Sequence, residues 1–260
     1  MLKRLSISPV LIISFLLSSI LFAIVSFGVS SHNSFGDFVI TTDNAVHSLL
    51  FENAQPVWIA KVMLFFTYLG NTETITATVI IIFILLYIFK RRQLATFFIG
   101  GIGGAALLSQ FFKYSFGRAR PAEILYQVSR HGYSFPSGHA LIATIFYGFC
   151  AFCIIHVLHK RWQKILVGII AALVIILVGF SRIYLGVHWV SDVIGGWVLG
   201  VAVLSLLIIL FHLAHRHLKW TPLKPIHGIA LIAVVLLVVA LTFFIFHYYV
   251  THELIIRSIV

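Results

Sequence analysis

Charged residues are scarce in this sequence, and acidic residues are the scarcest of them. Only 10% of the 260 residues are charged, and seven Asp and Glu stand against 18 Lys and Arg. A typical soluble domain has about 25% charged and about 45–50% apolar residues, whereas 61% are hydrophobic here and the mean hydropathy is +1.08. A soluble fold cannot bury so much apolar surface. The composition therefore excludes a soluble enzyme and a disordered chain, and it indicates a lipid bilayer as the solvent.

Cysteine is also rare, which excludes a disulfide scaffold. Cys150 and Cys153 lie within one apolar run, and we expect them to be small core residues. The net charge of +11 would indicate a nucleic-acid partner on a soluble domain. On a membrane chain it indicates loops that face an anionic lipid surface, and we expect no nucleic-acid partner.

Seven apolar runs are long enough to cross a bilayer, which takes about 20 residues. They cover 10–29, 75–89, 94–112, 140–158, 165–185, 193–213 and 226–250. The sequence thus predicts an all-α polytopic membrane helix bundle over 1–260, a single domain with a six-span core and a seventh C-terminal span. The first run also fits a secretory signal, and we expect a retained span. Val57–Leu69 contains Lys61 and is predicted as an interfacial or partly buried helix; an eighth span there would invert all that follows.

The charges favour one orientation, because basic residues concentrate in cytoplasmic loops. With the N terminus inside, eleven of the 18 basic residues lie in short inner loops and all seven acids lie outside. The inner basic residues are Lys3, Arg4, Lys90, Arg91, Arg92, Lys160, Arg161, Lys164, Arg216, Lys219 and Lys224. We therefore expect a multi-pass protein of the plasma membrane with a cytoplasmic N terminus.

Basic residues that remain on the outer side need an explanation, and a bound anion provides one. Lys113 and Arg120 follow the third span, and Arg182 ends the fifth. The topology brings three segments, 113–121, 136–139 and 181–192, to the outer ends of spans three to six. Arg118, Arg130 and Lys61 fit interfacial anchors as readily as site residues, and His131 is a weaker candidate for the entrance.

These segments match three motifs, K-x6-R-P, P-S-G-H and S-R-x5-H-x3-D, with every position filled. The chain thereby resembles the type 2 phosphatidic acid phosphatases, whose superfamily includes vanadium haloperoxidases. The resemblance covers 94–213. Size, topology and the pattern at 67–70 resemble the bacterial branch of phosphatidylglycerophosphatase B and undecaprenyl diphosphate phosphatase.

The resemblance implies a role for each motif residue, and the residue chemistry supports it. Three cations, Lys113, Arg120 and Arg182, would bind phosphate oxygens, aided by Ser137 and the backbone of Gly138. His188 would be the nucleophile that forms a phosphohistidine, with its ring oriented by Asp192 four residues later. His139 would protonate the leaving group. We expect no metal and no cofactor.

The resemblance implies a phosphatase that acts on a membrane lipid phosphate at the extracytoplasmic face. Undecaprenyl diphosphate is the favoured substrate, and phosphatidylglycerophosphate or phosphatidate come next. Two alternatives stay open: a vanadate-dependent haloperoxidase and a lipid-phosphate transporter. The oligomeric state does not follow from the sequence.

Overall fold

A computed structural model describes residues 8–51, 56–122 and 132–217, together with residues 232, 233, 236, 240 and 243. These residues form eight ordered helices and no strand, as the predicted all-α class requires. The helices are α1 (Pro9–Ser30), α2 (Ser34–Phe51), α3 (Val57–Leu69), α4 (Thr72–Ile88), α5 (Arg92–Phe116), α6 (Gly138–Val157), α7 (Arg161–Tyr184) and α8 (Val190–His217). The predicted seventh span, 226–250, lies outside the described residues except at the five isolated positions.

Five described helices are long and apolar enough to cross a bilayer: α1, α5, α6, α7 and α8. Helices α3 and α4 pass the same test only as a pair, bent by 41°. The predicted span at 75–89 falls within α4, whose 17 residues measure about 25 Å against a hydrocarbon core of roughly 30 Å. The bent pair of α3 and α4 has the form of a broken span or a re-entrant loop, and Asn71 caps α4 at the bend by accepting a hydrogen bond from Thr72 N.

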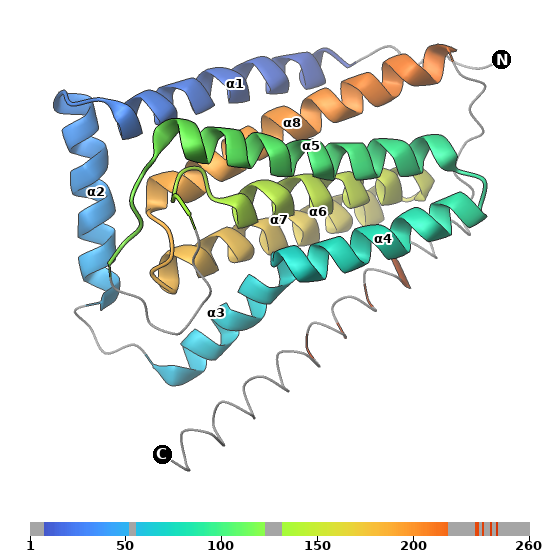
Figure 1. Ribbon diagram of the computed structural model, residues 1–260. Coiled ribbons are helices and arrows are strands. Elements are labelled where there is room, and N and C mark those ends of the chain that lie inside the picture. Colours follow the sequence, from blue (N-terminus) through green and yellow to red (C-terminus); the bar gives the residue numbers. More distant parts are fainter. Residues whose placement is uncertain are drawn as a thin grey trace.

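The bundle has two distinct ends because successive long helices run in opposite directions (Figure 1). The C-terminal ends of α5 and α7 meet the N-terminal ends of α6 and α8 at one end, which we call the α2 end because α2 lies beside it. Helix α1 packs along α8, α6 packs against α7 and α8, and α3 packs against α7. Helix α2 was not expected, because its aspartates and other polar residues interrupt every apolar run within it.

Glycines allow α6 and α8 to approach closely. A Cβ added at Gly196 would lie 2.6 Å from Ser137 O, and one at Gly200 would lie 2.6 Å from Thr144 Cβ. Gly100 and Gly104 in α5 differ, since no described atom lies within 4 Å of an added Cβ at either position.

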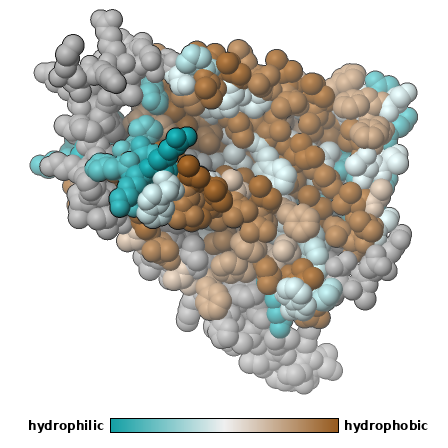
Figure 2. Space-filling model, turned by 180° about the vertical axis from the view of Figure 1, so that it is seen from behind, coloured by the Kyte–Doolittle hydropathy of each residue, from teal (hydrophilic) through white to brown (hydrophobic). Residues whose placement is uncertain are grey.

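The surface of the bundle is apolar between its two ends. Figure 2 shows hydrophobic residues over the middle of one face, with hydrophilic residues toward the left and right edges. Large exposed apolar side chains line α7 in particular, including Ile165, Ile169, Leu173 and Ile176. Such a surface is stable in lipid and not in water, which fits a multi-span membrane protein.

Candidate active site

Helix ends carry the three polar segments to the α2 end of the bundle. Helix α5 ends at Gly117, whose φ of +57° is left-handed and whose N–H bonds to Lys113 O at 3.0 Å. This turn directs the next residues, Arg118 and Arg120, back across the bundle end. Ser137 precedes the first residue of α6, and its N–H bonds to Asp192 O at 3.0 Å. The second and third segments are therefore joined directly.

His188 lies between α7 and α8 and is held on both sides of its ring. Its Nδ1 is 3.3 Å from Asp192 Oδ2, and its Nε2 is 3.2 Å from Nη1 of Arg120. Because a guanidinium can only donate, Nε2 accepts and carries the lone pair. The proton then lies on Nδ1, facing the carboxylate. This is the tautomer that a nucleophilic Nε2 needs.

The surroundings of His188 favour its neutral form. Burial lowers the pKa of His188 well below its usual range, and the positive charges of Arg120, Lys113 and Arg182 lower it further. A neutral imidazole keeps its lone pair at the pH where an exposed histidine begins to protonate.

Two cations of the first segment bond to backbone carbonyls of the neighbouring turn. Lys113 Nζ donates to Tyr133 O at 2.7 Å. Arg120 donates to Val187 O at 2.7 Å and to Gly132 O at 3.0 Å. These bonds hold both charges beside His188 without neutralising them, because carbonyl oxygens carry no formal charge.

Arg182 is the most exceptional polar group of the site. Its side chain is only 2% exposed, yet neither Nε nor Nη1 has a hydrogen-bond partner among the described residues. The buried Oγ of Ser137 likewise lacks a partner within the described chain. Buried donors without acceptors are costly. Their presence beside His188 indicates a place built for an anion.

His139 lies in the first turn of α6, on the remaining side of the site. Arg182, His188, Lys113 and Arg120 are all close enough to act on it electrostatically. The backbone at Gly70, where α3 and α4 join, packs against it: a Cβ added at Gly70 would lie 3.4 Å from His139 Cδ2 and 2.4 Å from Val178 Cγ1. The structure therefore brings all the predicted site residues to one end of the bundle, including Gly138, which lies between Ser137 and His139 at the start of α6.

Comparison with known proteins matches the part of the chain that carries the three motif segments. The model of the PAP2 superfamily matches residues 94–216. A phosphatidylglycerophosphatase B of Bacillus subtilis is 32% identical over 164 residues, which cover 63% of this chain and 80% of that protein.

This chain belongs to the PAP2 superfamily.

Two further relatives extend the PAP2 comparison. An undecaprenyl-diphosphatase of Sulfolobus acidocaldarius is 38% identical over 122 residues, 45% of this chain and 55% of that protein. The crystal structure of a transmembrane PAP2 type phosphatidylglycerolphosphate phosphatase from Bacillus subtilis has a TM-score of 0.67 and 28% identity, covering 78% of this chain and 98% of that one. As a membrane member of the PAP2 family, the chain is a lipid phosphatase.

Sequence reasoning missed a second layer of this PAP2 site. Arg118 is not an interfacial anchor: Nη1 donates to Asp192 Oδ1 at 2.6 Å, and Nη2 donates to Asp43 Oδ2 at 2.7 Å. Ser191 also bonds to Asp43, through its N–H at 2.9 Å and its Oγ at 2.5 Å. Ser134 Oγ donates to Asp192 Oδ2. Arg130 and His131 lie outside the described residues.

This layer fixes the carboxylate of Asp192 from several directions. Besides Arg118 and Ser134, the N–H of Trp189 donates to Oδ2 at 2.9 Å. The only signal for Arg118 was its place two residues before Arg120, and Asp43 was one acid in a chain that has few. Within the described part of the chain, no group of three or more His, Cys, Asp or Glu is placed to hold a metal ion.

Proposed function

We propose that this PAP2 enzyme removes the terminal phosphate of a lipid diphosphate, with undecaprenyl diphosphate as the favoured substrate, through a phosphohistidine at the extracytoplasmic face. The observation that carries the proposal is the buried guanidinium of Arg182 beside a neutral His188. Its Nε and Nη1 have no hydrogen-bond acceptor among the described residues. A phosphoryl group supplies the acceptors that this guanidinium lacks.

In the first step, His188 Nε2 attacks the terminal phosphorus. Arg120 moves its hydrogen bond from Nε2 to a phosphoryl oxygen, and Lys113 and Arg182 bind the other oxygens. A nitrogen–phosphorus bond forms and the bond from phosphorus to the leaving oxygen breaks. His139, protonated when the negative charge of the bound phosphate offsets the nearby cations, gives its proton to that oxygen, so the lipid leaves as a monophosphate. Asp192 stabilises the positive charge that develops on the imidazole.

In the second step, a water molecule releases the phosphate. His139, now neutral, accepts a proton from the water as its oxygen attacks phosphorus. The nitrogen–phosphorus bond breaks, inorganic phosphate leaves, and His188 returns to its neutral form. The three cations stabilise the transferring group in both steps, since its charge lies on the same three oxygens.

The names of the relatives support two substrates. The Sulfolobus protein is named an undecaprenyl-diphosphatase, which supports undecaprenyl diphosphate as the substrate. The Bacillus relative and the Bacillus crystal structure are named for phosphatidylglycerophosphate, and they make that lipid the second candidate. Both substrates present a terminal phosphoryl group to the same cations, joined through an anhydride bond in the diphosphate and through an ester bond in phosphatidylglycerophosphate.

A panel of lipid phosphates tests the substrate. Purified protein in detergent should release phosphate from undecaprenyl diphosphate with a higher kcat/KM than from phosphatidylglycerophosphate or phosphatidate. Alkaline quenching during turnover should trap phosphate on His188, because phosphohistidine is stable to alkali and labile to acid. A higher kcat/KM for phosphatidylglycerophosphate would select the second candidate. Release without any trapped phosphohistidine would overturn the mechanism.

The proposed sidedness rests on the charge distribution, because Arg92, Arg161 and Lys164 lie at the end opposite the site. Cysteines placed at Asp37 in α2 and at Gln163 in α7 report on the two ends, since Cys150 and Cys153 are buried. In sealed right-side-out vesicles, an impermeant maleimide should label the Asp37→Cys variant and not Gln163→Cys. The reverse pattern would place the site in the cytoplasm.

A further inference from the structure

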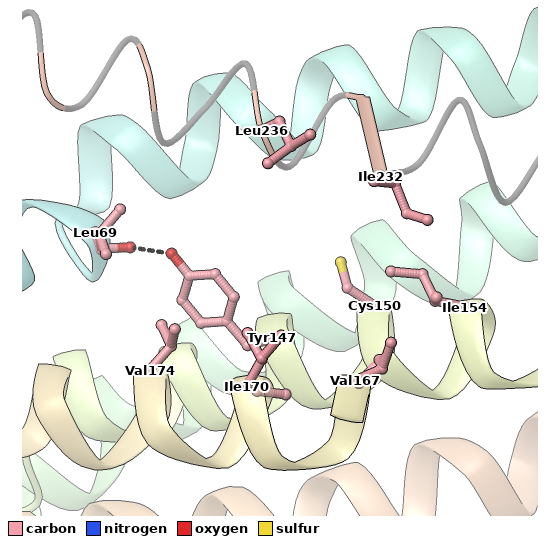
Figure 3. Close-up of a pocket in the computed structure, with 11 residues that line it drawn as sticks. Leu69, Tyr147, Cys150, Ile154, Val167, Ile170, Val174, Ile232 and Leu236 are labelled. Atoms are coloured by element: carbon pink, nitrogen blue, oxygen red, sulfur yellow. Dashed lines mark hydrogen bonds between the residues drawn. The ribbon is translucent and has the colours of Figure 1, made fainter. Parts of the chain in front are cut away.

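A cavity of about 270 Å³ lies between α6 and α7, away from the polar site. Tyr147, Cys150 and Ile154 of α6 line one wall, and Val174 of α7 lies on another (Figure 3). Ala171 of α7 also lines the cavity. We call this space the tail cavity.

The lining of the tail cavity is almost entirely apolar. The hydroxyl of Tyr147 donates to Leu69 O at 2.9 Å, so its hydrogen bond is already used within the wall (Figure 3). The Cys150 thiol is a weak donor. No charged residue lines the cavity within the described chain. Its chemistry suits a hydrocarbon, and water or a headgroup would find few partners there.

The tail cavity begins about two helical turns below the phosphate site, along the same two helices. On α6, Tyr147 follows His139 by eight residues, or about 12 Å of helix, and on α7 Val174 precedes Arg182 by the same number. Leu69 lines the cavity, and Gly70 beside it packs against His139. The cavity extends to Ile154, which is about 22 Å from His139 along α6. It therefore runs toward the bilayer interior from beneath the catalytic groups.

Described residues of the C-terminal segment form the opposite wall. Ile232 and Leu236 face α6 and α7 across the cavity (Figure 3). Leu236 is 62% exposed and Ile170 on α7 is 52% exposed, so the cavity opens toward the lipid side. A hydrocarbon longer than the cavity can continue into the bilayer through this opening.

We propose that the tail cavity binds the hydrocarbon tail of the lipid phosphate substrate, with Ile232 and Leu236 of the C-terminal segment as one wall. This inference rests on the proposed function. The tail gains little hydrophobic energy there, because it leaves an equally apolar bilayer. The cavity acts through shape and position. A tail that lies in it holds the phosphate at His188, and a tail that cannot enter leaves the phosphate displaced.

Filling the cavity tests this inference. Ala171→Phe places a ring inside it, whereas Ala172→Phe places the same ring on the exposed face of α7. The measured quantity is a ratio: kcat/KM for a long-chain lipid phosphate divided by kcat/KM for a soluble analogue. The tail of the analogue is too short to reach Tyr147 when its phosphate is bound at His188. We expect Ala171→Phe to lower this ratio by about tenfold or more and Ala172→Phe to keep the wild-type ratio. Equal ratios in the two variants would overturn the inference.

Photo-crosslinking of the wild-type protein decides the case if the ring in the cavity prevents folding. A long-chain lipid phosphate with a diazirine in its tail should label peptides that contain Cys150, Ile154 or Ala171, and excess unlabelled lipid phosphate should suppress the label. Competed label confined to α1 and α5 would overturn the inference. A wild-type protein that hydrolyses neither substrate would instead overturn the proposed function, and the crosslinked positions would still report where the tail lies.

Discussion

The phosphate site at the α2 end and the tail cavity about 12 Å below it are built by opposite means. At the phosphate site, charged side chains from α2, α5 and α8 are fixed by hydrogen bonds such as those from Arg118 to Asp43 and Asp192. In the tail cavity, apolar walls surround an open space, and the hydrogen bond from Tyr147 to Leu69 lies within the wall. A phosphate is recognised by a few atoms at fixed positions, whereas a tail is recognised by the volume left open.

The largest effect should come from removing the nucleophile. His188→Ala should lower kcat by at least about 10⁴-fold for every lipid phosphate, whatever its tail, because no other group can form the covalent intermediate. Phosphate release is the measurement. The matched control is His212→Ala in α8, whose ring bonds to Ile208 O at 2.7 Å near the opposite end. Activity of His188→Ala within tenfold of wild type would remove this residue from its role.

Two arginines of the site should separate catalysis from stability. Arg182→Met should lower kcat/KM by about 10²–10³-fold and leave the thermal midpoint in detergent unchanged or higher, since it removes a buried charge that lacks partners among the described residues. Arg118→Met should lower the free energy of unfolding by about 3–5 kcal/mol, because Asp43 and Asp192 would stay buried without their partner. A large loss of stability in Arg182→Met alone would reverse these assignments.

Asp43 tests how far the phosphate site extends into α2. Asp43→Asn should lower kcat by about tenfold with little change in KM, because Arg118 would no longer be held in place against Asp192. A residue with a purely structural role would reduce the folded fraction without changing kcat of the folded enzyme. Kinetics normalised to correctly folded protein distinguish the two, and an unchanged kcat would restrict Asp43 to stability.

The pH dependence of kcat/KM should report the effect of the nearby positive charges on His188. Its lowered pKa means that the neutral nucleophile persists below pH 6.5, so the acid limb of kcat/KM should lie below the ordinary histidine value. Arg120→Gln removes one of the positive charges that lower this pKa, and the acid limb should then move to higher pH. A limb that moves to lower pH in this variant would contradict the tautomer and the role assigned to His188.

The smallest effect should come from a chelator. Excess EDTA should leave kcat/KM within about twofold, because Lys113, Arg120 and Arg182 supply the positive charge that a metal provides in other phosphoryl transfers. Orthovanadate should inhibit, since it adopts the shape of the transferring phosphoryl group. Restoration of activity by added magnesium after chelation would contradict this prediction.

The sequence predicted most of the helices because hydropathy alone determines which segments lie in lipid. The expected run 140–158 became α6 and the run 193–213 became α8, with ends that differ by a few residues. Helix α2 was not predicted because Asp37 and Asp43 lower its hydropathy. The bend of 41° between α3 and α4 was equally hidden, because hydropathy does not show the angle between two consecutive helices.

The motif residues were predictable because phosphate chemistry fixes their types and their spacing. The supporting residues were not. Asp43 and Arg118 are 75 residues apart, and a pairing over that distance leaves no local pattern. Ser134 is one serine among many until the fold places it against Asp192. The tail cavity could not be predicted from the sequence for a further reason. A volume between helices depends on how the helices pack, and nothing distinguishes Ala171 from any other small residue of a membrane helix.

Gly70 lies where two requirements meet. The join between α3 and α4 passes so close to Val178 and His139 that an added Cβ would overlap the first and contact the second. The same backbone therefore forms the bend between α3 and α4 and borders His139, the proposed acid. A side chain introduced there would displace Val178 or the join, which also carries Leu69 of the tail cavity, so a substitution at this position would disturb the phosphate site and the tail cavity together. Evolution of a new lipid preference would have to proceed through residues deeper in the cavity, where the walls can change while the chemistry at their upper edge stays the same.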